Sequence, residues 1–188
     1  MMRLKEKYKK EVVPEMIKKI GYKNIFQVPK IKKVVLNVGF GKMIIGKTSG
    51  EQSKIREAIM RDLSMISGQK PSLRKARKSI ASFKLRKGMP VGAICTLRGQ
   101  RMYDFLDRLI HIALPRTRDF KGIAESSIDK SGNMTIGIKE HTVFPEISPE
   151  EVKFIFGLEI TIVTTAKSKE EALELFKLLD FPIRYKNG

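Results

Sequence analysis

Two spacings of apolar residues alternate along the chain, and each predicts a different kind of secondary structure. Apolar residues three or four positions apart indicate amphipathic helices, and apolar residues alternating with polar ones indicate strands with one buried face. The first spacing predicts helices over 4–20, 55–66 and 102–113, with a short capped helix starting at Ser148 and a last one starting at Ser168. The second predicts strands over 31–40, 91–99, 134–139 and 159–166, while 71–79 is basic but able to pair as a strand.

Strands that follow one another without a helix between them favour an antiparallel or mixed sheet with helices on one face. We therefore expect a single α+β domain over residues 1–188, a length that suits one hydrophobic core. Two prolines should disturb helices: Pro14 should kink or restart the first, and Pro115 should close the third. Residues 117–133 show no clear period and are expected to be mostly loop.

One short stretch, GKMIIGKT at 41–48, matches the phosphate-binding pattern G-x-x-x-x-G-K-[ST] and lies between a predicted strand and a predicted helix. A nucleotidase with this loop also needs a parallel sheet and an apolar strand ending in aspartate to position magnesium. Neither is predicted here, and the bulky Met43, Ile44 and Ile45 replace the small residues that let backbone N–H groups surround phosphate. We interpret the stretch as a strand-to-helix connection and keep an RNA-stimulated nucleotidase as an alternative.

Positive charge is concentrated in one part of the chain. The formal net charge is +18, from 38 Lys and Arg against 20 Asp and Glu. Residues 63–103 contain ten basic residues and no acidic one, so this segment cannot neutralise itself and indicates a polyanionic partner such as RNA. Within it, residues 78–88 are small and basic, which predicts a long exposed hairpin loop.

Other classes of function find little support in the sequence. No apolar run approaches the roughly 18 to 20 residues of a membrane span, and the N-terminus is charged where a signal peptide is apolar. Cys95, the single cysteine, is expected to face the core and fits a reducing compartment. Neither His111 nor His141 has a third ligand at zinc spacing, and Asp104 and Asp107 lack a catalytic partner. We therefore expect no metal, no cofactor, no membrane partner and no enzyme.

Alternation also predicts which strand residues face away from the core. If Leu36 and its alternate neighbours are buried, Asn37 faces the other way. The same reasoning turns outward Thr96 and Arg98 on the second strand, and Thr135, Gly137 and Lys139 on the third. Amide, hydroxyl and cationic groups on one face suit phosphates and ribose 2′-hydroxyls, so we expect this face to bind RNA.

Five segments, taken in order, resemble a known family: QVPKIKKVVLNVGFG, ISGQKPSLRKARKSIASFKLRKGMPVG, CTLRGQRMYDFLDRLI, LPRTRDFKGI and GLEITIVTTAKSKEEA. They are similar to ribosomal protein five of the large subunit, of bacterial or organellar type, with LSMISGQKPSLRKARKS as the signature stretch. The resemblance covers nearly the whole chain. It implies a structural protein that binds 5S ribosomal RNA and attaches it to the central protuberance. It also implies contacts with 23S ribosomal RNA, P-site transfer RNA, neighbouring proteins of the central protuberance, and small-subunit head protein thirteen in an intersubunit bridge.

By position, the resemblance implies that Asn37, Gln69 and Thr96 contact 5S ribosomal RNA. The expected set around them adds Gly39, Ser67, Lys70 and Arg98. The loop 78–88 is expected to reach transfer RNA through Lys78, Ser79, Ala81, Ser82, Phe83, Lys84, Arg86 and Lys87. Two features depart from the family pattern, namely Pro14 and a longer connection over 42–54. The expected location is the ribosome of the cytoplasm, or of an organellar matrix or stroma, with a free RNA-binding regulator as an alternative.

Overall fold

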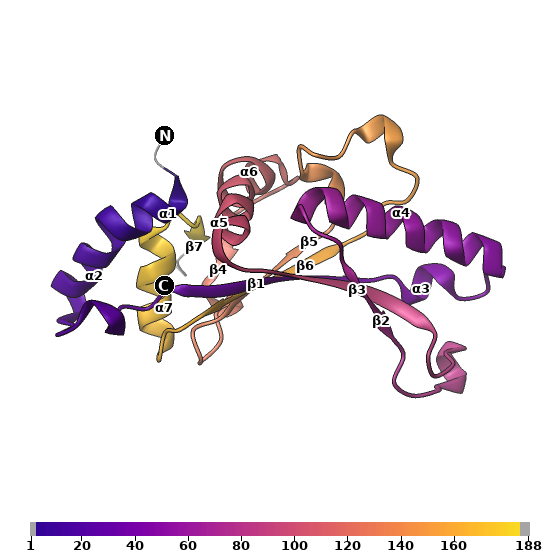
Figure 1. The fold of residues 1–188 in the computed structure, drawn as a ribbon, viewed down its shortest axis with the longest axis horizontal. Helices are drawn as coiled ribbons and strands as arrows, with labels where there is room; N and C mark the ends of the chain where they lie inside the picture. The colour runs from indigo at the N-terminus through magenta and orange to yellow at the C-terminus, as the bar shows by residue number, and fades with distance from the viewer. Residues whose placement is uncertain (1–2, 185–188) are drawn as a thin grey trace.

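The computed structural model describes residues 3–184, which fold around an antiparallel sheet. Its strands are β1 (Ile31–Gly39), β2 (Ser72–Lys75), β3 (Pro90–Leu97), β4 (Ile123–Ala124), β5 (Met134–Ile138), β6 (Leu158–Thr164) and β7 (Ile183–Arg184). Five of them form the sheet in the order β2-β3-β1-β6-β5, so β1 lies in the centre and β2 and β5 form the edges (Figure 1). All pairs within this sheet are antiparallel.

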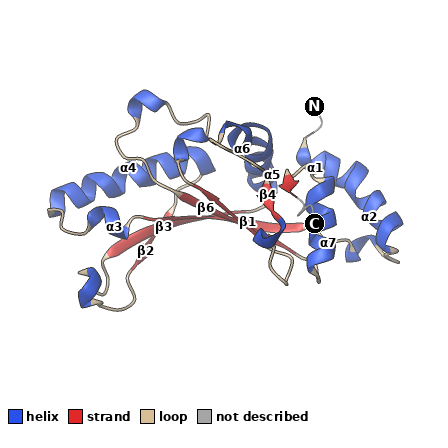
Figure 2. Cartoon of the chain, turned by 180° about the vertical axis from the view of Figure 1, so that it is seen from behind, coloured by secondary structure: helices blue, strands red, loops and turns tan. Residues whose placement is uncertain are grey.

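The helices gather on one face and at one end of the sheet. The α-helices are α1 (Leu4–Lys7), α2 (Val13–Ile20), α3 (Gly41–Ile44), α4 (Ser49–Ser67), α5 (Gly99–Arg108), α6 (Leu114–Arg116) and α7 (Lys169–Leu178). The chain also forms two π turns, η1 (Tyr8–Val12) and η4 (Leu109–Ala113), and short 3-10 turns η2 (Ile25–Gln27), η3 (Ala81–Phe83), η5 (Glu125–Ser127), η6 (His141–Val143) and η7 (Pro149–Glu151). Helices α4, α5 and α6 cover one face, while α1, α2 and α7 lie together at one end (Figures 1 and 2). This confirms the predicted α+β fold.

Alternation along the central strand separates a buried face from an open one. Leu36 of β1 is fully buried, whereas Asn37 and Gly39 are exposed. Leu36 pairs with Cys95 of β3 and Ile160 of β6, and paired residues share a face, so the core continues across all three strands. Cys95 is a buried free thiol, as predicted.

Two prolines within helical segments are accommodated by π turns. η1 precedes Pro14 and η4 precedes Pro115, and each proline then occupies the first turn of the next α-helix. The π turn widens the helix before each proline, which gives room for a ring that would otherwise clash with a carbonyl of the preceding turn. At Pro14 the predicted interruption takes the form of this π turn, and the backbone stays helical through it, so the helix does not restart. The predicted closure at Pro115 is confirmed to within one residue, since α6 ends at Arg116 and Thr117 donates its hydroxyl to the Ala113 carbonyl.

The two predicted helix starts at serine residues have different outcomes. Ser168 accepts a hydrogen bond from the Glu171 N–H at 3.2 Å and starts α7, as predicted. The prediction of a capped short helix starting at Ser148 is wrong, because η7 is a single 3-10 turn and the Ser148 side chain makes no capping hydrogen bond.

The stretch without a clear period is largely irregular, as predicted. Residues 117–133 are mostly loop, but β4 within them pairs in parallel with β7. Within residues 3–184, no helix has both the length and the apolarity to cross a bilayer.

A buried histidine ties α4 to the connection between β5 and β6. His141 is completely buried and stacks on Phe156 with ring centroids 3.8 Å apart. Its Nε2 lies 3.3 Å from Oδ2 of the buried Asp62, without a well-aligned hydrogen bond, and Asp62 accepts a hydrogen bond from Nε of Arg61 at 3.0 Å. No local pattern pairs these residues in the sequence. The contacts give His141 a role in packing, and residues 3–184 contain no cluster of three metal-ligating side chains.

The burial of His141 should make the stability of the fold depend on pH. Burial lowers its pKa below 6.5, and the Asp62 carboxylate opposes this shift only in part. Below about pH 6.5 the unfolded chain therefore binds more protons than the folded one, so stability should fall as pH falls, by at most about 1.4 kcal/mol per pH unit. We expect His141→Gln to flatten this slope in urea unfolding series between about pH 6.5 and 5. An unchanged slope would assign the pH dependence to other groups.

Candidate nucleic-acid interface

The face of the sheet opposite the helices carries polar residues on neighbouring strands. Asn37 pairs with Ile94 of β3, and Val35 pairs with Thr96, so Asn37 and Thr96 are diagonal neighbours on one face. Diagonal neighbours on adjacent strands lie about 7–8 Å apart. An amide and a hydroxyl at this spacing can bond to neighbouring groups of one RNA strand.

Gln69 reaches the same region from the turn that follows α4. Its Nε2 donates to the Thr96 carbonyl at 3.0 Å, so the side chain is fixed beside β3. Ser67 is only 3% exposed, and its hydroxyl donates to the Gln69 carbonyl at 2.9 Å. The structure thus brings Gln69 and Thr96 together but buries Ser67, to which we assign support of the turn instead of direct contact. Lys70, the next residue, is exposed.

Cations surround this part of the face. Arg98 is exposed just beyond the end of β3. Arg74 of β2 opposes Gly92, which in turn opposes Gly39, so Arg74 borders a strip without side chains. Lys33 lies on the same face of β1 as Asn37. It is not among the residues expected on the RNA-binding face, although strand alternation alone predicts that its side chain faces that way. Arg74 could not be placed from sequence, because its neighbours depend on the register of β2.

An acidic residue divides the open face. Glu159 of β6 is exposed and pairs with Asn37 on one side and with Gly137 of β5 on the other. Thr135, Gly137 and Lys139 are exposed, as predicted, and lie beyond Glu159 toward the far edge of the sheet. The open face therefore has a region around Asn37 and Thr96 and a separate region along β5.

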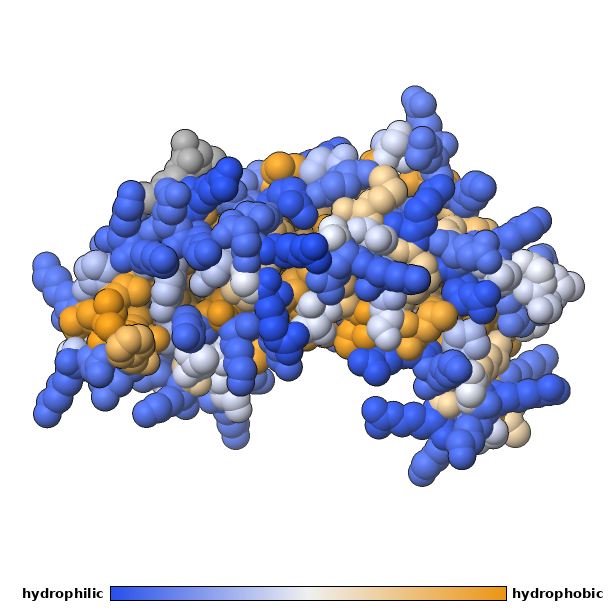
Figure 3. All heavy atoms as spheres, viewed as in Figure 1, coloured by the Kyte–Doolittle hydropathy of each residue, from blue (hydrophilic) through white to orange (hydrophobic). Residues whose placement is uncertain are grey.

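Residues 78–88 form the projecting tip of the β2–β3 hairpin (Figure 1). Ile80 and Leu85 bridge across the tip, and the Lys87 N–H donates to the Ser79 hydroxyl at 3.0 Å. Each side chain that the resemblance assigns to transfer RNA is exposed: Lys78, Ser79, Ala81, Ser82, Phe83, Lys84, Arg86 and Lys87. Figure 3 shows the molecule hollowed between this hairpin and the end that carries α2 and α7, with hydrophilic side chains on both sides of the hollow and hydrophobic surface above it.

The stretch 41–48 stabilises a helix terminus instead of surrounding a phosphate. Ile44 is buried in α3, and Gly46 turns the chain with φ of 77°. Thr48 and Glu51 form a complete capping box at α4: Oγ1 of Thr48 accepts from the Glu51 N–H at 3.4 Å, and the Glu51 carboxylate accepts from the Thr48 N–H at 2.9 Å. A carboxylate of the chain thus already accepts hydrogen bonds at the N-terminus of α4, where an anion would otherwise be favoured. The interpretation as a strand-to-helix connection is confirmed.

Comparison with known proteins agrees with this geometry. Residues 24–86 match the family described as Ribosomal protein L5, and residues 90–183 match the family that describes the C-terminus of the same ribosomal protein. The large ribosomal subunit protein uL5 of Thermoanaerobacter sp. strain X514 is 54% identical over 182 residues, which cover 97% of this chain and 98% of that protein. The proteins of the same name from Syntrophomonas wolfei and Dictyoglomus turgidum are 53% and 54% identical, over 98% and 96% of this chain and 100% and 98% of their own lengths.

These matches run through both the sheet and the basic hairpin, and these three relatives are all bacterial. They confirm the bacterial type that the sequence resembles and the ribosome of the cytoplasm as the location. The chain belongs to the ribosomal protein L5 family and is a structural, non-enzymatic constituent of the large ribosomal subunit, among ribosomal RNA and other ribosomal proteins.

Proposed function

We propose that the whole chain acts as one domain whose open face binds 5S ribosomal RNA and attaches it to the central protuberance. The observation that carries this proposal is the joint placement of Asn37, Gln69 and Thr96 on adjacent elements of the open face. Because Gln69 is bonded to β3, these groups need little ordering when RNA arrives, which lowers the entropic cost of binding. The nearby Lys70 and Arg98 supply phosphate contacts, which add affinity without reading sequence.

Removing the polar groups of this face should weaken binding without unfolding the protein. Asn37→Ala and Thr96→Ala should each cost about 1 to 3 kcal/mol, or about 5- to 150-fold in affinity, if the hydrogen bonds they lose are desolvated in the complex. The affinity for 5S ribosomal RNA is measured by filter binding at physiological salt. Ser126→Ala serves as the control, because this exposed hydroxyl lies on the connection between β4 and β5. Unchanged affinity for both variants would remove the support for this face.

The hairpin is the second element of the proposal, as the contact to P-site transfer RNA. Its tip is exposed, and the 61% exposed Phe83 lies among cations. A ribose or base could stack on such a ring while the cations neutralise phosphates. The proposal also includes contacts with 23S ribosomal RNA, with neighbouring central-protuberance proteins, and with small-subunit head protein thirteen in an intersubunit bridge. These partners follow from the family resemblance and are assigned to no residues.

Charge removal at the hairpin should separate the two RNA contacts. The triple variant Lys84→Gln, Arg86→Gln and Lys87→Gln should bind 5S ribosomal RNA as tightly as the unchanged protein. Ribosomes carrying it should release P-site transfer RNA about tenfold faster, since each exposed ion pair contributes roughly 0.2 to 1 kcal/mol. Lys9→Gln, Lys10→Gln and Lys18→Gln on the N-terminal helices remove the same charge and provide the control. Equal release rates for the two triple variants would refute the hairpin contact.

A further inference from the structure

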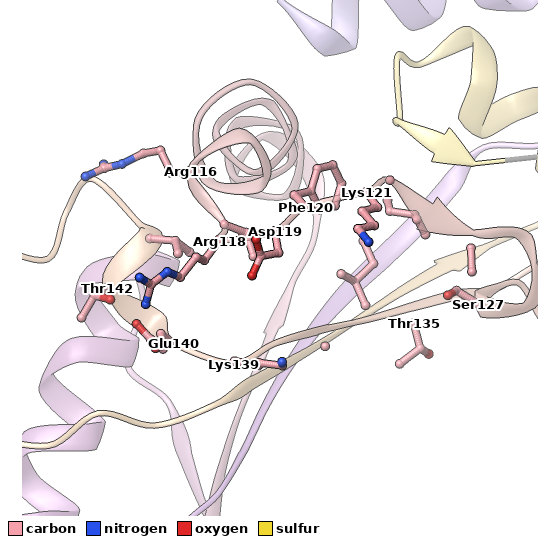
Figure 4. A pocket seen from close by; sticks show the side chains of 17 residues that line it. Arg116, Arg118, Asp119, Phe120, Lys121, Ser127, Thr135, Lys139, Glu140 and Thr142 are labelled. Atoms are coloured by element: carbon pink, nitrogen blue, oxygen red, sulfur yellow. The ribbon is translucent and has the colours of Figure 1, made fainter.

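A cleft of about 710 Å³ lies between residues 116–124 and strand β5. Figure 4 shows Asp119 and Lys121 pointing from this segment toward β5, Arg118 extending toward Glu140 and Thr142, and Lys139 on the opposite side. The hydroxyls of Ser127, Thr135 and Thr142 also line the cleft. None of these residues belongs to the 5S RNA contact proposed above, which lies on β1 and β3.

The segment that roofs the cleft is anchored at both of its ends. At the first end, the Thr117 hydroxyl and N–H donate to the Ala113 and Leu114 carbonyls at 3.0 and 3.1 Å. At the other, the Ile123 N–H donates to the Pro182 carbonyl at 2.7 Å, where β4 pairs with β7. Gly122 has a φ of 91°, and a Cβ there would lie 3.1 Å from that same carbonyl, so only glycine fits. The cleft is therefore a fixed feature of the fold.

The cations around the cleft have no partner within the described chain. Among residues 3–184, neither a hydrogen bond nor an ion pair reaches the side chains of Arg116, Arg118, Lys121 or Lys139, and all four are exposed. The carboxylates of Asp119 and Glu140 also line the cleft, which leaves a net positive charge. An anionic ligand would satisfy the cations, while the carboxylates could accept from hydroxyl or amino groups.

The edge of β5 adds a backbone donor to the cleft, and the first residues of this edge are already paired. The Asn133 N–H donates to the Asp129 carboxylate, and the Asn133 carbonyl accepts from the Asp129 N–H. Both bonds lie on the side of β5 away from β6. Since backbone direction alternates along a strand, the backbone of Gly137 also points away from β6. Gly137 is exposed and lines the cleft. The bridge between Ile128 and Met134 already covers the start of the edge, which disfavours the addition of an extended polypeptide.

We infer that this cleft is a second RNA site, which binds one unpaired strand by its phosphates and 2′-hydroxyls. Its volume suits one or two nucleotides and excludes a duplex. Cations, hydroxyls and a backbone N–H along the lining match the phosphodiester backbone and ribose. Glu159 separates the cleft from the Asn37 region, so the two sites take different RNA segments. The inference rests on the proposed function only in its choice of RNA as the ligand.

The test uses a labelled single-stranded RNA of about 12 nucleotides, within the usual range of single-strand site sizes. It is titrated against the full chain, both free and saturated with 5S ribosomal RNA. The cleft variant carries Arg118→Gln, Lys121→Gln and Lys139→Gln, and the matched control carries Lys9→Gln, Lys10→Gln and Lys18→Gln. Each triple removes three exposed cations, so net charge falls equally. A glutamate-rich peptide of the same length tests a polypeptide ligand.

We expect the cleft variant to bind the oligonucleotide at least about tenfold more weakly, with a salt slope smaller by about 2, and the control to change less than about threefold. Saturation with 5S RNA should not displace the oligonucleotide, and the cleft variant should keep its 5S affinity. Equal losses in the two triples, displacement by 5S RNA, or tighter binding of the peptide would each overturn the inference. The titration of the free chain tests the cleft even if the chain does not bind 5S RNA. The cleft site and the 5S site can therefore be refuted independently.

Discussion

Replacing His141 with alanine is expected to lower the free energy of unfolding by about 3 to 5 kcal/mol, because it leaves a cavity in place of a fully buried ring. His141 is completely buried against the carboxylate of Asp62, which is itself only 2% exposed. Without the imidazole, this carboxylate would retain the hydrogen bond from Arg61 but would face a cavity. The stacking on Phe156 would also be lost, which adds about 0.5 to 1.5 kcal/mol. Urea unfolding at pH 7 measures the change.

The chain offers a matched control in its other histidine. His111 lies on a helix surface beside Asp107, so His111→Ala should cost less than about 1 kcal/mol. The loss of stability in His141→Ala can come from leaving the Asp62 carboxylate without the imidazole beside it. In that case, the double variant Asp62→Asn, His141→Ala should lose less stability than the sum of the two single variants. Similar losses for the two histidine variants would show that the buried pair has no special role.

Gly132→Ala should destabilise the fold by about 2 to 4 kcal/mol, the second large effect. Gly132 has a φ of 76°, which L-residues rarely adopt. A Cβ there would lie 2.8 Å from the Cβ of Ala166 and 3.1 Å from that of Ala172, in the packing of α7 against the sheet. Thermal and urea unfolding of the purified variant measure the loss.

Gly46 separates the two causes of this loss. Its φ of 77° is nearly the same, but a Cβ there would meet nothing within 4 Å. Gly46→Ala should therefore show the backbone cost alone, about 1 to 2 kcal/mol. The difference between the two variants measures the cost of the close contacts at Gly132, and no difference would mean that α7 moves aside without penalty.

The part of the interface that depends on strand alternation could be predicted from the sequence. The period of two residues along β1 predicted the outward direction of Asn37, and the same period on β3 predicted that of Thr96. The neighbourhood of these residues could not be predicted, because it depends on how strands pair. Arg74 and Glu159 lie on the same face only through the registers of β2 and β6, which no local pattern reports.

Long-range contacts and small backbone adjustments also escape local patterns. The contact of Asp62 with His141 joins an α-helix to a distant loop, and both residues read as ordinary polar positions. The parallel pairing of β4 with β7 involves two residues on each side, too few to leave a period. At Pro14 and Pro115, π turns keep the backbone helical up to and through the proline, where proline chemistry alone predicts a break.

The 41–48 stretch shows why a motif needs its structural context. Thr48 stands where the phosphate-binding pattern requires it, but the same residue type is also a favoured helix cap. Glu51, three residues later, completes the capping box and places negative charge at the helix N-terminus. This pairing was already visible in the sequence, and it distinguishes a capped helix from a phosphate site.

Binding of the purified chain to 5S ribosomal RNA over a range of salt concentrations, with a structured RNA of equal length as competitor, tests the central proposal most directly. A charge of +18 alone gives affinity that falls steeply with salt and ignores the identity of the RNA. We predict that a large preference for 5S RNA survives at physiological salt and that it shrinks in the Asn37→Ala and Thr96→Ala variants. A preference that vanishes at physiological salt would contradict the proposal, because net charge would then account for all of the binding.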